Sequence, residues 1–332
     1  MKRTVLTLNL LLGATVFAGN EIKLGTESFS VGLDNESGAI AAVTIDGQKI
    51  ETGLRERFFD IQEDRGWRSN SNALFQVTGI DQKDRDTAVT RMTWGPWVIE
   101  MKTTCFPEKR MIRRAFVLTW MADTPTKIRS FWFKEGLFPV APSGSYRLPG
   151  RFPAVAVSRS AFQEGRKQHQ GGSPPVVIAD FSTGLSAFWT ADHSVPYADH
   201  SSLSVTECAK GLDVVQSFAT RGHIRKGVPI EIGDAWVCFS SGDGEAALRN
   251  MKNWFVQVGQ VVPKDRPEWL KSVLLYSMHP GGTTGSMFRD LGGFQAARAL
   301  LPHIRGLGCN AIWVLPVEDE SVYSPRDYYK LA

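Results

Sequence analysis

The chain has 332 residues, of which 42% are hydrophobic and 22% charged, and this composition excludes a disordered or fibrous protein. Its formal net charge of +4 is too small for the concentrated basic face that a nucleic-acid-binding protein usually carries. The 31 glycines, 17 prolines and 19 phenylalanines indicate a turn-rich, β-rich protein, and the length predicts two domains.

The first 18 residues have the features of a secretory signal peptide. Lys2 and Arg3 precede an apolar stretch that ends at Phe17, and Val16 and Ala18 are acceptable residues in front of a cleavage site. The stretch is shorter than the roughly 20 residues of a membrane-spanning helix. We therefore expect a secreted or periplasmic protein, cleaved after about Ala18 and without a membrane span. An uncleaved anchor or a buried N-terminal helix is the alternative.

Four cysteines are spread widely along the chain, at Cys105, Cys208, Cys238 and Cys309. None belongs to a Cys-x-x-Cys or histidine-containing spacing, so we predict no zinc site. Three of them lie in apolar runs, where a buried free thiol is favoured over a disulfide. The sequence leaves any disulfide pairing open.

Residues 19–241 carry the pattern of a β-sandwich domain. Phe29, Val31 and Leu33 alternate with smaller or polar residues, and Asp46-Gly47 is a strong hairpin signal. Further apolar or alternating runs predict strands at 43–45, 97–101, 111–120, 128–133, 176–178, 185–189 and 230–239. Because no convincing helix interrupts this region, one large antiparallel sandwich is favoured over several small domains.

Residues 163–175 are polar and rich in glycine and proline, and they predict a long surface loop. A small basic cluster in this loop, around Arg166 and Lys167, could touch an acidic ligand. A solvated loop is the favoured interpretation, because functional loops are a minority of polar ones.

In residues 242–267 the spacing of apolar residues changes from that of a strand to that of a helix. We interpret this segment as a connecting helix and a linker. Apolar residues recur at helical spacing, at Ala247, Met251, Trp254, Phe255 and Val258. Asp243 is the predicted N-cap and Gly259 the predicted residue beyond the end of the helix. We expect the apolar stripe to pack on the sandwich, and residues 262–267 to form the linker.

Residues 268–332 have an α/β rhythm. A short apolar strand is predicted at 273–276, a helix at about 294–307 that is kinked at Pro302 and ended by Gly308, and a buried strand at 310–316. A strand, a helix and a strand in this order predict a parallel pair joined by a right-handed crossover.

Three short motifs of this segment follow one another closely. Leu307-Gly308 ends the helix, residues 310–316 (NAIWVLP) form the strand, and residues 323–329 (YSPRDYY) follow in a loop. Together they resemble the opening of the catalytic barrel of the α-amylase superfamily, glycoside hydrolase family 13, over about the last fifth of the chain. The strands and turns before them, such as residues 33–38, resemble in pattern the galactose-mutarotase-like supersandwich that precedes several glycosidase barrels.

The resemblance implies a mainly β protein with an N-terminal antiparallel β-supersandwich, followed in residues 268–332 by the first βαβ unit of an incomplete TIM (β/α)8 barrel. A complete barrel needs roughly 250 residues, whereas 65 residues follow Pro267. In the family the catalytic acids lie on later barrel strands, so we expect them beyond the end of this chain. We therefore assign no catalytic residue within it and predict that the chain alone is inactive.

The same resemblance implies three substrate-binding residues. The family tyrosine that matches Tyr323 stacks under the sugar beside the scissile bond, since an aromatic ring covers the C–H face of a pyranose. A rim tyrosine packed on the sandwich is the alternative. Asp327 matches a carboxylate that mainly supports the loop. Glu318 stands with Asp319 and Glu320 after a barrel strand, at the face where such enzymes place their sites. A solvated acidic loop or a cation site is the favoured interpretation of this charge run, and a functional contact with substrate is the alternative.

The leading hypothesis is an exported glycoside hydrolase or transglycosidase that acts on α-linked oligo- or polysaccharides by a two-carboxylate retaining mechanism. We expect no cofactor and no metal; calcium would suit the acidic loop, but no motif supports it. One alternative is a non-catalytic carbohydrate-binding or interaction protein built on the sandwich. The other is an α-galactosidase-like enzyme, with the same supersandwich and a different barrel.

Overall fold

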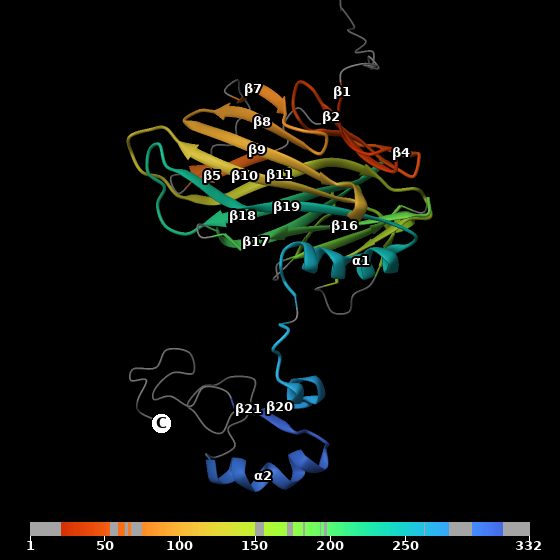
Figure 1. Cartoon of the computed structure of the whole chain (residues 1–332), viewed down its shortest axis with the longest axis vertical. Helices are drawn as coiled ribbons and strands as arrows, with labels where there is room; N and C mark the ends of the chain where they lie inside the picture. Colours follow the sequence, from red (N-terminus) through yellow and green to blue (C-terminus); the bar gives the residue numbers. More distant parts are fainter. Residues whose placement is uncertain are drawn as a thin grey trace, which may run out of the picture. The chain divides into compact units, whose positions relative to one another are not determined.

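The structure is a computed structural model, and it describes residues 21–53, 59–63, 66–67, 75–149, 156–170, 175–181, 183–192, 194–195, 198–261, 263–278 and 294–314. The chain divides into two compact units between Gly259 and Gln260, and each unit has its own buried apolar cluster. Figure 1 traces the elements of both units in chain order.

Three antiparallel sheets build the first unit. The four-stranded sheet has the order β1-β2-β3-β4, with β1 (Glu21–Gly25), β2 (Phe29–Asp34), β3 (Ile40–Ile45) and β4 (Gln48–Glu51). The order of the nine-stranded sheet is β13-β12-β15-β16-β19-β10-β9-β8-β7, with β7 (Phe75–Gln82), β8 (Thr87–Trp94), β9 (Trp97–Phe106), β10 (Met111–Trp120), β12 (Ser145–Arg147), β13 (Val157–Ser158), β15 (Val176–Asp180), β16 (Leu185–Asp192) and β19 (Pro229–Ser241). The six-stranded sheet has the order β14-β17-β18-β11-β5-β6, with β5 (Phe59–Glu63), β6 (Gly66–Trp67), β11 (Ile128–Pro139), β14 (Lys167–Gln170), β17 (Ala198–Cys208) and β18 (Gly211–Thr220). The predicted mainly β, antiparallel sandwich-type fold is confirmed.

All three sheets contribute side chains to the core of this unit. One apolar cluster combines residues of the four-stranded, nine-stranded and six-stranded sheets, and a second lies mainly between the nine-stranded and six-stranded sheets. Along β9, Trp97 and Ile99 are buried while the residue between them is partly exposed, which is the period of two expected of a strand with one buried face. Trp97 packs on Trp120 with ring centroids 4.8 Å apart. Phe116 packs on Phe131 of the opposite sheet at 4.9 Å. The aromatic residues noted in the sequence thus supply much of the core.

The strands predicted from alternation are confirmed, but the loop predicted at 163–175 is wrong in part. Residues 167–170 form β14, which pairs antiparallel with β17 at the edge of the six-stranded sheet. An edge strand tolerates polar residues, and Lys167 and His169 are exposed, so its sequence resembles that of a loop. Residues 171–174 lie outside the described part of the chain.

The predicted connecting helix is confirmed as α1 (Gly244–Gln257). The side chain of Asp243 accepts hydrogen bonds from the backbone N–H groups of Glu245 and Ala246, as an N-cap should. Gly259 follows the helix at φ +80°, a left-handed conformation that glycine adopts without strain. The helix lies along the outer face of the nine-stranded sheet (Figure 1). Its apolar stripe packs there, and Trp254 is buried against Trp236.

The second unit contains a 3-10 turn (Glu268–Ser272), β20 (Leu275–Met278), α2 (Phe294–Gly306) and β21 (Ala311–Val314). β20 and β21 pair in parallel, as predicted, although β20 begins two residues later than expected. The prediction that the second strand is buried is wrong for its described residues, because Trp313 and Val314 of β21 are exposed. Asn310 links the N-terminal ends of the two strands. Its side-chain oxygen accepts a hydrogen bond from the N–H of Leu274 at 2.9 Å, and its side-chain amide donates one to the carbonyl of Ser272 at 2.8 Å. The first residue of the NAIWVLP motif therefore fixes where the parallel pair starts.

Two further expectations concern thiols and membranes. All four cysteines are free, with Cys105 and Cys238 buried. Burial raises the pKa of the Cys105 thiol to about 12, so this side chain is an inert core residue. Among the described residues, no helix has both the length and the apolar character needed to cross a bilayer.

Candidate functional site

The residues predicted to bind substrate, Tyr323, Asp327 and Glu318, lie outside the described part of the chain. Their roles stay predictions. Among the residues that the structure does describe, no group of three or more His, Cys, Asp or Glu side chains could hold a metal ion. The polar site that the structure describes lies in the sandwich unit.

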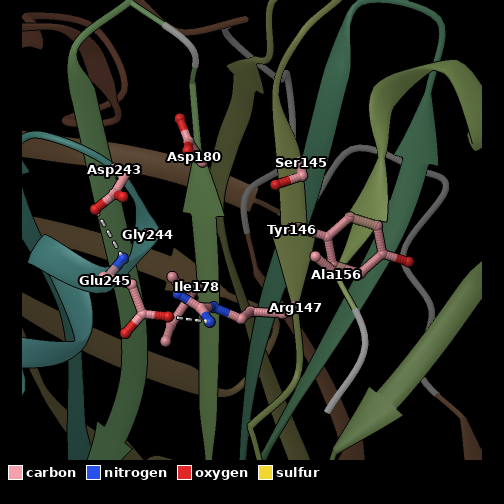
Figure 2. Close-up of a pocket in the computed structure, with 9 residues that line it drawn as sticks. All are labelled: Ser145, Tyr146, Arg147, Ala156, Ile178, Asp180, Asp243, Gly244 and Glu245. Atoms are coloured by element: carbon pink, nitrogen blue, oxygen red, sulfur yellow. Dashed lines mark hydrogen bonds and ion pairs between the residues drawn. The ribbon is translucent and has the colours of Figure 1, made fainter.

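A polar pocket of about 220 Å3 lies between the N-terminal turn of α1 and the edge strands of the nine-stranded sheet (Figure 2). We call it the α1 pocket. It is lined by Ser145, Tyr146, Arg147, Ala156, Ile178, Asp180, Asp243, Gly244 and Glu245. Its volume is below the roughly 300–1,000 Å3 of sites for drug-sized ligands, so it suits a single small ring.

Strand β12 contributes two side chains to the α1 pocket, because successive side chains of a strand point to opposite faces of the sheet. Ser145 and Arg147 point to the pocket side of the sheet, and Tyr146 between them points to the other side (Figure 2). Gly244 lies in the first turn of α1, and a Cβ atom there would lie 3.0 Å from a terminal nitrogen of Arg147, so the guanidinium would have to shift. The absence of a side chain at this position lets the guanidinium lie against the helix.

The charges of the α1 pocket are mixed. Arg147 donates to Glu245 Oε1 at 2.6 Å, with 24% of the arginine side chain and 53% of the glutamate side chain exposed. Asp243 Oδ1 accepts from two backbone N–H groups at 3.1 Å each, and Asp180 lies across the pocket from them (Figure 2). The α1 pocket thus combines carboxylates, which accept hydrogen bonds, with a guanidinium and a hydroxyl, which donate them. Such a mixture of donors and acceptors suits a neutral polyol such as a sugar.

A buried network lies behind the α1 pocket, on the core side of β12. Tyr146 Oη donates to Glu207 Oε1 at 2.6 Å, Arg166 Nε donates to the same oxygen at 2.8 Å, and the N–H of Gln163 donates to Oε2 at 2.6 Å. Gln168 donates to Tyr146 Oη at 2.6 Å. The Glu207 side chain is fully buried, and Arg166 is its ion-pair partner.

The network decides the protonation of its members. Burial alone would raise the pKa of Glu207, but the hydrogen bonds from Arg166, Tyr146 and Gln163 outweigh it and hold that pKa below the ordinary 4.5. The pKa of the Tyr146 hydroxyl lies well above its usual range. Burial is the larger cause, and the adjacent Glu207 is the second. Arg166, which the sequence placed in a solvated loop, therefore binds an acidic residue of this chain and fixes strands β12, β14 and β17 together.

A second cluster of charges lies on the outer face of the nine-stranded sheet. Asp234 accepts from Arg113 Nε at 2.8 Å, and β16 places Asp192 directly opposite Asp234. Burial, with contributions from Asp192 and Glu231, raises the pKa of Asp234 to about 6 despite Arg113. The sequence did not indicate this cluster, because its members come from strands that are far apart in the chain.

No family model matches the sequence, and no curated protein sequence matches it either. Similar solved structures include an α-N-acetylgalactosaminidase from Bifidobacterium bifidum in a GalNAc complex, with TM-score 0.56, 10% identity and coverage of 88% of this chain and 51% of that one. A family 36 α-galactosidase from Geobacillus stearothermophilus has TM-score 0.51 and 12% identity, over 91% of this chain and 56% of that one. An α-galactosidase from Lactobacillus brevis has TM-score 0.50 and 8% identity, over 90% of this chain and 48% of that one.

The chain thus spans about half the length of these solved structures. Identities near 10% show a shared fold and nothing finer. The matches are to α-galactosidase and α-N-acetylgalactosaminidase structures, so the resemblance to glycoside hydrolase family 13 is not confirmed. The chain has a glycoside hydrolase-like fold.

Proposed function

We propose that this chain is the sandwich-bearing part of an exported glycoside hydrolase or transglycosidase that acts on α-linked sugars, with α-galactosides and α-N-acetylgalactosaminides as its first candidate substrates. The observation that carries the proposal is the shared fold, at TM-score 0.56 over 88% of this chain, with an α-N-acetylgalactosaminidase. The order of elements, a sandwich, then a connecting helix, then a parallel βαβ unit, adds support.

The proposed chemistry is retaining hydrolysis by two carboxylates. In such enzymes one carboxylate attacks the sugar and the other protonates the leaving oxygen, and the two groups stand about 5 Å apart. In this proposal neither of the two catalytic carboxylates is among the described residues, whose contribution is the sandwich. Tyr323 would form the platform under the sugar ring, and Glu318 and Asp327 would bind or support substrate beside it.

The test is an assay of the protein encoded by the whole gene, with p-nitrophenyl α-galactoside, α-N-acetylgalactosaminide and α-glucoside as substrates. A β-galactoside is the matched control, because it differs only at the anomeric carbon. Hydrolysis of an α-glycoside with the β-glycoside left intact supports the proposal. A protein that binds and cleaves none of the α-glycosides contradicts it.

The second candidate function, non-catalytic sugar binding, is favoured by the mixed donors and acceptors of the α1 pocket. It predicts that this chain by itself binds a neutral monosaccharide, and that Arg147→Met abolishes the binding. Arg91→Met is the matched control, because Arg91 forms a similar exposed ion pair with Glu100, at 2.9 Å, outside the pocket. Equal loss in both variants, or no binding by the parent chain, would count against this function.

A further inference from the structure

A second depression of the first unit lies where β17 turns into β18. It has a volume of about 460 Å3 and is lined by Val140, Pro142, Arg159, Ser160, Ala209 and Lys210. We call it the Arg159 groove. Its floor is apolar, with Val140 buried, and no residue that lines it carries a negative charge.

The Arg159 guanidinium is held in a fixed position in this groove. One terminal nitrogen donates to the carbonyl of Ala209, and the guanidinium carbon lies 4.8 Å from the ring centre of Phe162. The Phe162 ring is in turn fixed by an edge contact with Tyr146 at 5.5 Å. The Arg159 side chain makes no other polar contact with the described residues, so its remaining side-chain N–H groups are available to a ligand.

Lys210 supplies the second positive charge. It lies in the two-residue turn between β17 and β18, and its backbone carbonyl accepts from the N–H of Val140 at 3.3 Å. The residue is exposed, and its ammonium group has no ion-pair partner among the residues that the structure describes. Two cations beside an apolar floor leave a local excess of positive charge in a protein whose net charge is small.

We propose that the Arg159 groove binds a sugar ring that bears a carboxylate, of the uronic acid type. A carboxylate matches the planar fork of an arginine with two parallel hydrogen bonds, and a lysine adds a point charge beside it. Val140 and Pro142 give the C–H face of the ring an apolar surface, and the Ser160 hydroxyl can bond a ring hydroxyl. A pre-positioned guanidinium lowers the entropy cost of binding.

This inference does not depend on the proposed hydrolysis. It concerns an acidic sugar and a groove that shares no lining residue with the α1 pocket. It is therefore tested by binding, and its failure would leave the hydrolase proposal standing.

The test is calorimetric titration of the full chain with glucuronate, with glucose as the neutral analogue and acetate as the bare anion, at low and high salt. Glucuronate should bind at least tenfold more tightly than either analogue, and high salt should weaken it. Equal binding of glucose and glucuronate, equal binding of acetate and glucuronate, or no binding of glucuronate would each overturn the proposal.

Variants place the binding in the groove. Arg159→Gln should weaken the binding of glucuronate by about tenfold, because it removes a charged donor of two parallel hydrogen bonds. Lys210→Gln should weaken it by about threefold, and this side chain is exposed and unpaired, so the variant keeps the fold. Lys252→Gln, which removes an exposed charge on α1, is the control and should bind as the parent does. Equal weakening in the Lys252 and Lys210 variants would contradict the assignment.

Discussion

At the scale of single residues, the fully buried Glu207 is the clearest case of a charge that the fold has to satisfy. It remains ionised because Tyr146, Arg166 and the backbone of Gln163 all donate to it. A buried ion pair is weak evidence of net stabilisation, but loss of one partner leaves the other charge without compensation. We therefore interpret this network as a device that holds the edge strands in register.

Replacement of Glu207 by alanine tests this interpretation. We expect the free energy of unfolding to fall by about 3–5 kcal/mol, because the Tyr146 hydroxyl and the Arg166 charge lose their acceptor. The control is Glu164→Ala, since Glu164 is exposed on the neighbouring segment and should change stability by less than about 0.5 kcal/mol. Urea unfolding followed by circular dichroism measures both variants. Similar losses in the two would show that the network has no structural role.

Asp234 predicts a pH dependence of stability with a definite sign. Its pKa rises from 3.8 to about 6 on folding, so between these values the folded state keeps a proton that the unfolded state has released. The free energy of unfolding should therefore fall as the pH rises from about 4 to 6, by about 2–3 kcal/mol from this group.

The comparison of the parent with Asp234→Asn isolates that contribution, because asparagine keeps the size and shape of the side chain and does not titrate. Denaturant unfolding at pH 4 and pH 7 should show the parent losing stability relative to the variant over this range. A difference between the two proteins that does not change with pH would mean that Asp234 titrates near its ordinary value.

At the scale of elements, α1 is fixed to the sheet by one large side chain. Trp254 is 1% exposed and packs edge-on against Trp236 with ring centroids 6.4 Å apart. We expect Trp254→Ala to lower the free energy of unfolding by about 3–5 kcal/mol, the cost of an aromatic cavity. Val256, which is 54% exposed on the same helix, supplies the control: Val256→Ala should cost less than about 0.5 kcal/mol by the same urea titration. Comparable effects would show that α1 is not docked through Trp254.

How much of this could be predicted from the sequence depends on whether the signal is local. The alternation of β9 and the helical stripe of α1 reflect one buried face each, and both were predicted correctly. The strand β17 was missed because only Leu203 and Val205 alternate with polar residues in it, and two apolar residues within a serine-rich run are a weak signal. β14 was missed because an edge strand has the composition of a loop.

The candidate site could be predicted less well than the fold. The α1 pocket joins residues near positions 145, 180 and 245, and only Asp243 had a local signal, as an N-cap. The partner of Arg166 lies 41 residues further along the chain, so only the pairing of the strands brings Glu207 to it. Contacts of this kind follow from register, which a single sequence does not specify.

At the scale of the whole molecule, the chain is two units joined by an exposed segment. Its second unit has a small core of Met278, Ala297 and Ile304, while Trp313 is 57% and Leu275 49% exposed. Parallel strands are normally covered on both faces. The described part of this unit therefore has much less buried apolar surface than the sandwich, and we expect it to be the less stable of the two.

Limited trypsin digestion tests that difference. The first cleavage should follow Lys264, which is exposed in the connecting segment, and the resistant product should keep the sandwich and α1. Lys264→Gln should slow this first step, and mass spectrometry identifies the products. A resistant product that retains residues 270–314, or a first cleavage within the sheets, would contradict the expected order of stability.

The proposal that the sandwich belongs to a retaining enzyme for α-linked sugars has a direct test in the anomer that is released first. The most direct measurement is time-resolved proton NMR of p-nitrophenyl α-galactoside, or of the α-glycoside found to be cleaved best, during hydrolysis by the protein encoded by the whole gene. A retaining enzyme forms the α-anomer of the free sugar first, and this anomer then mutarotates. Formation of the β-anomer first, or no release of sugar from any α-glycoside, would contradict the proposal.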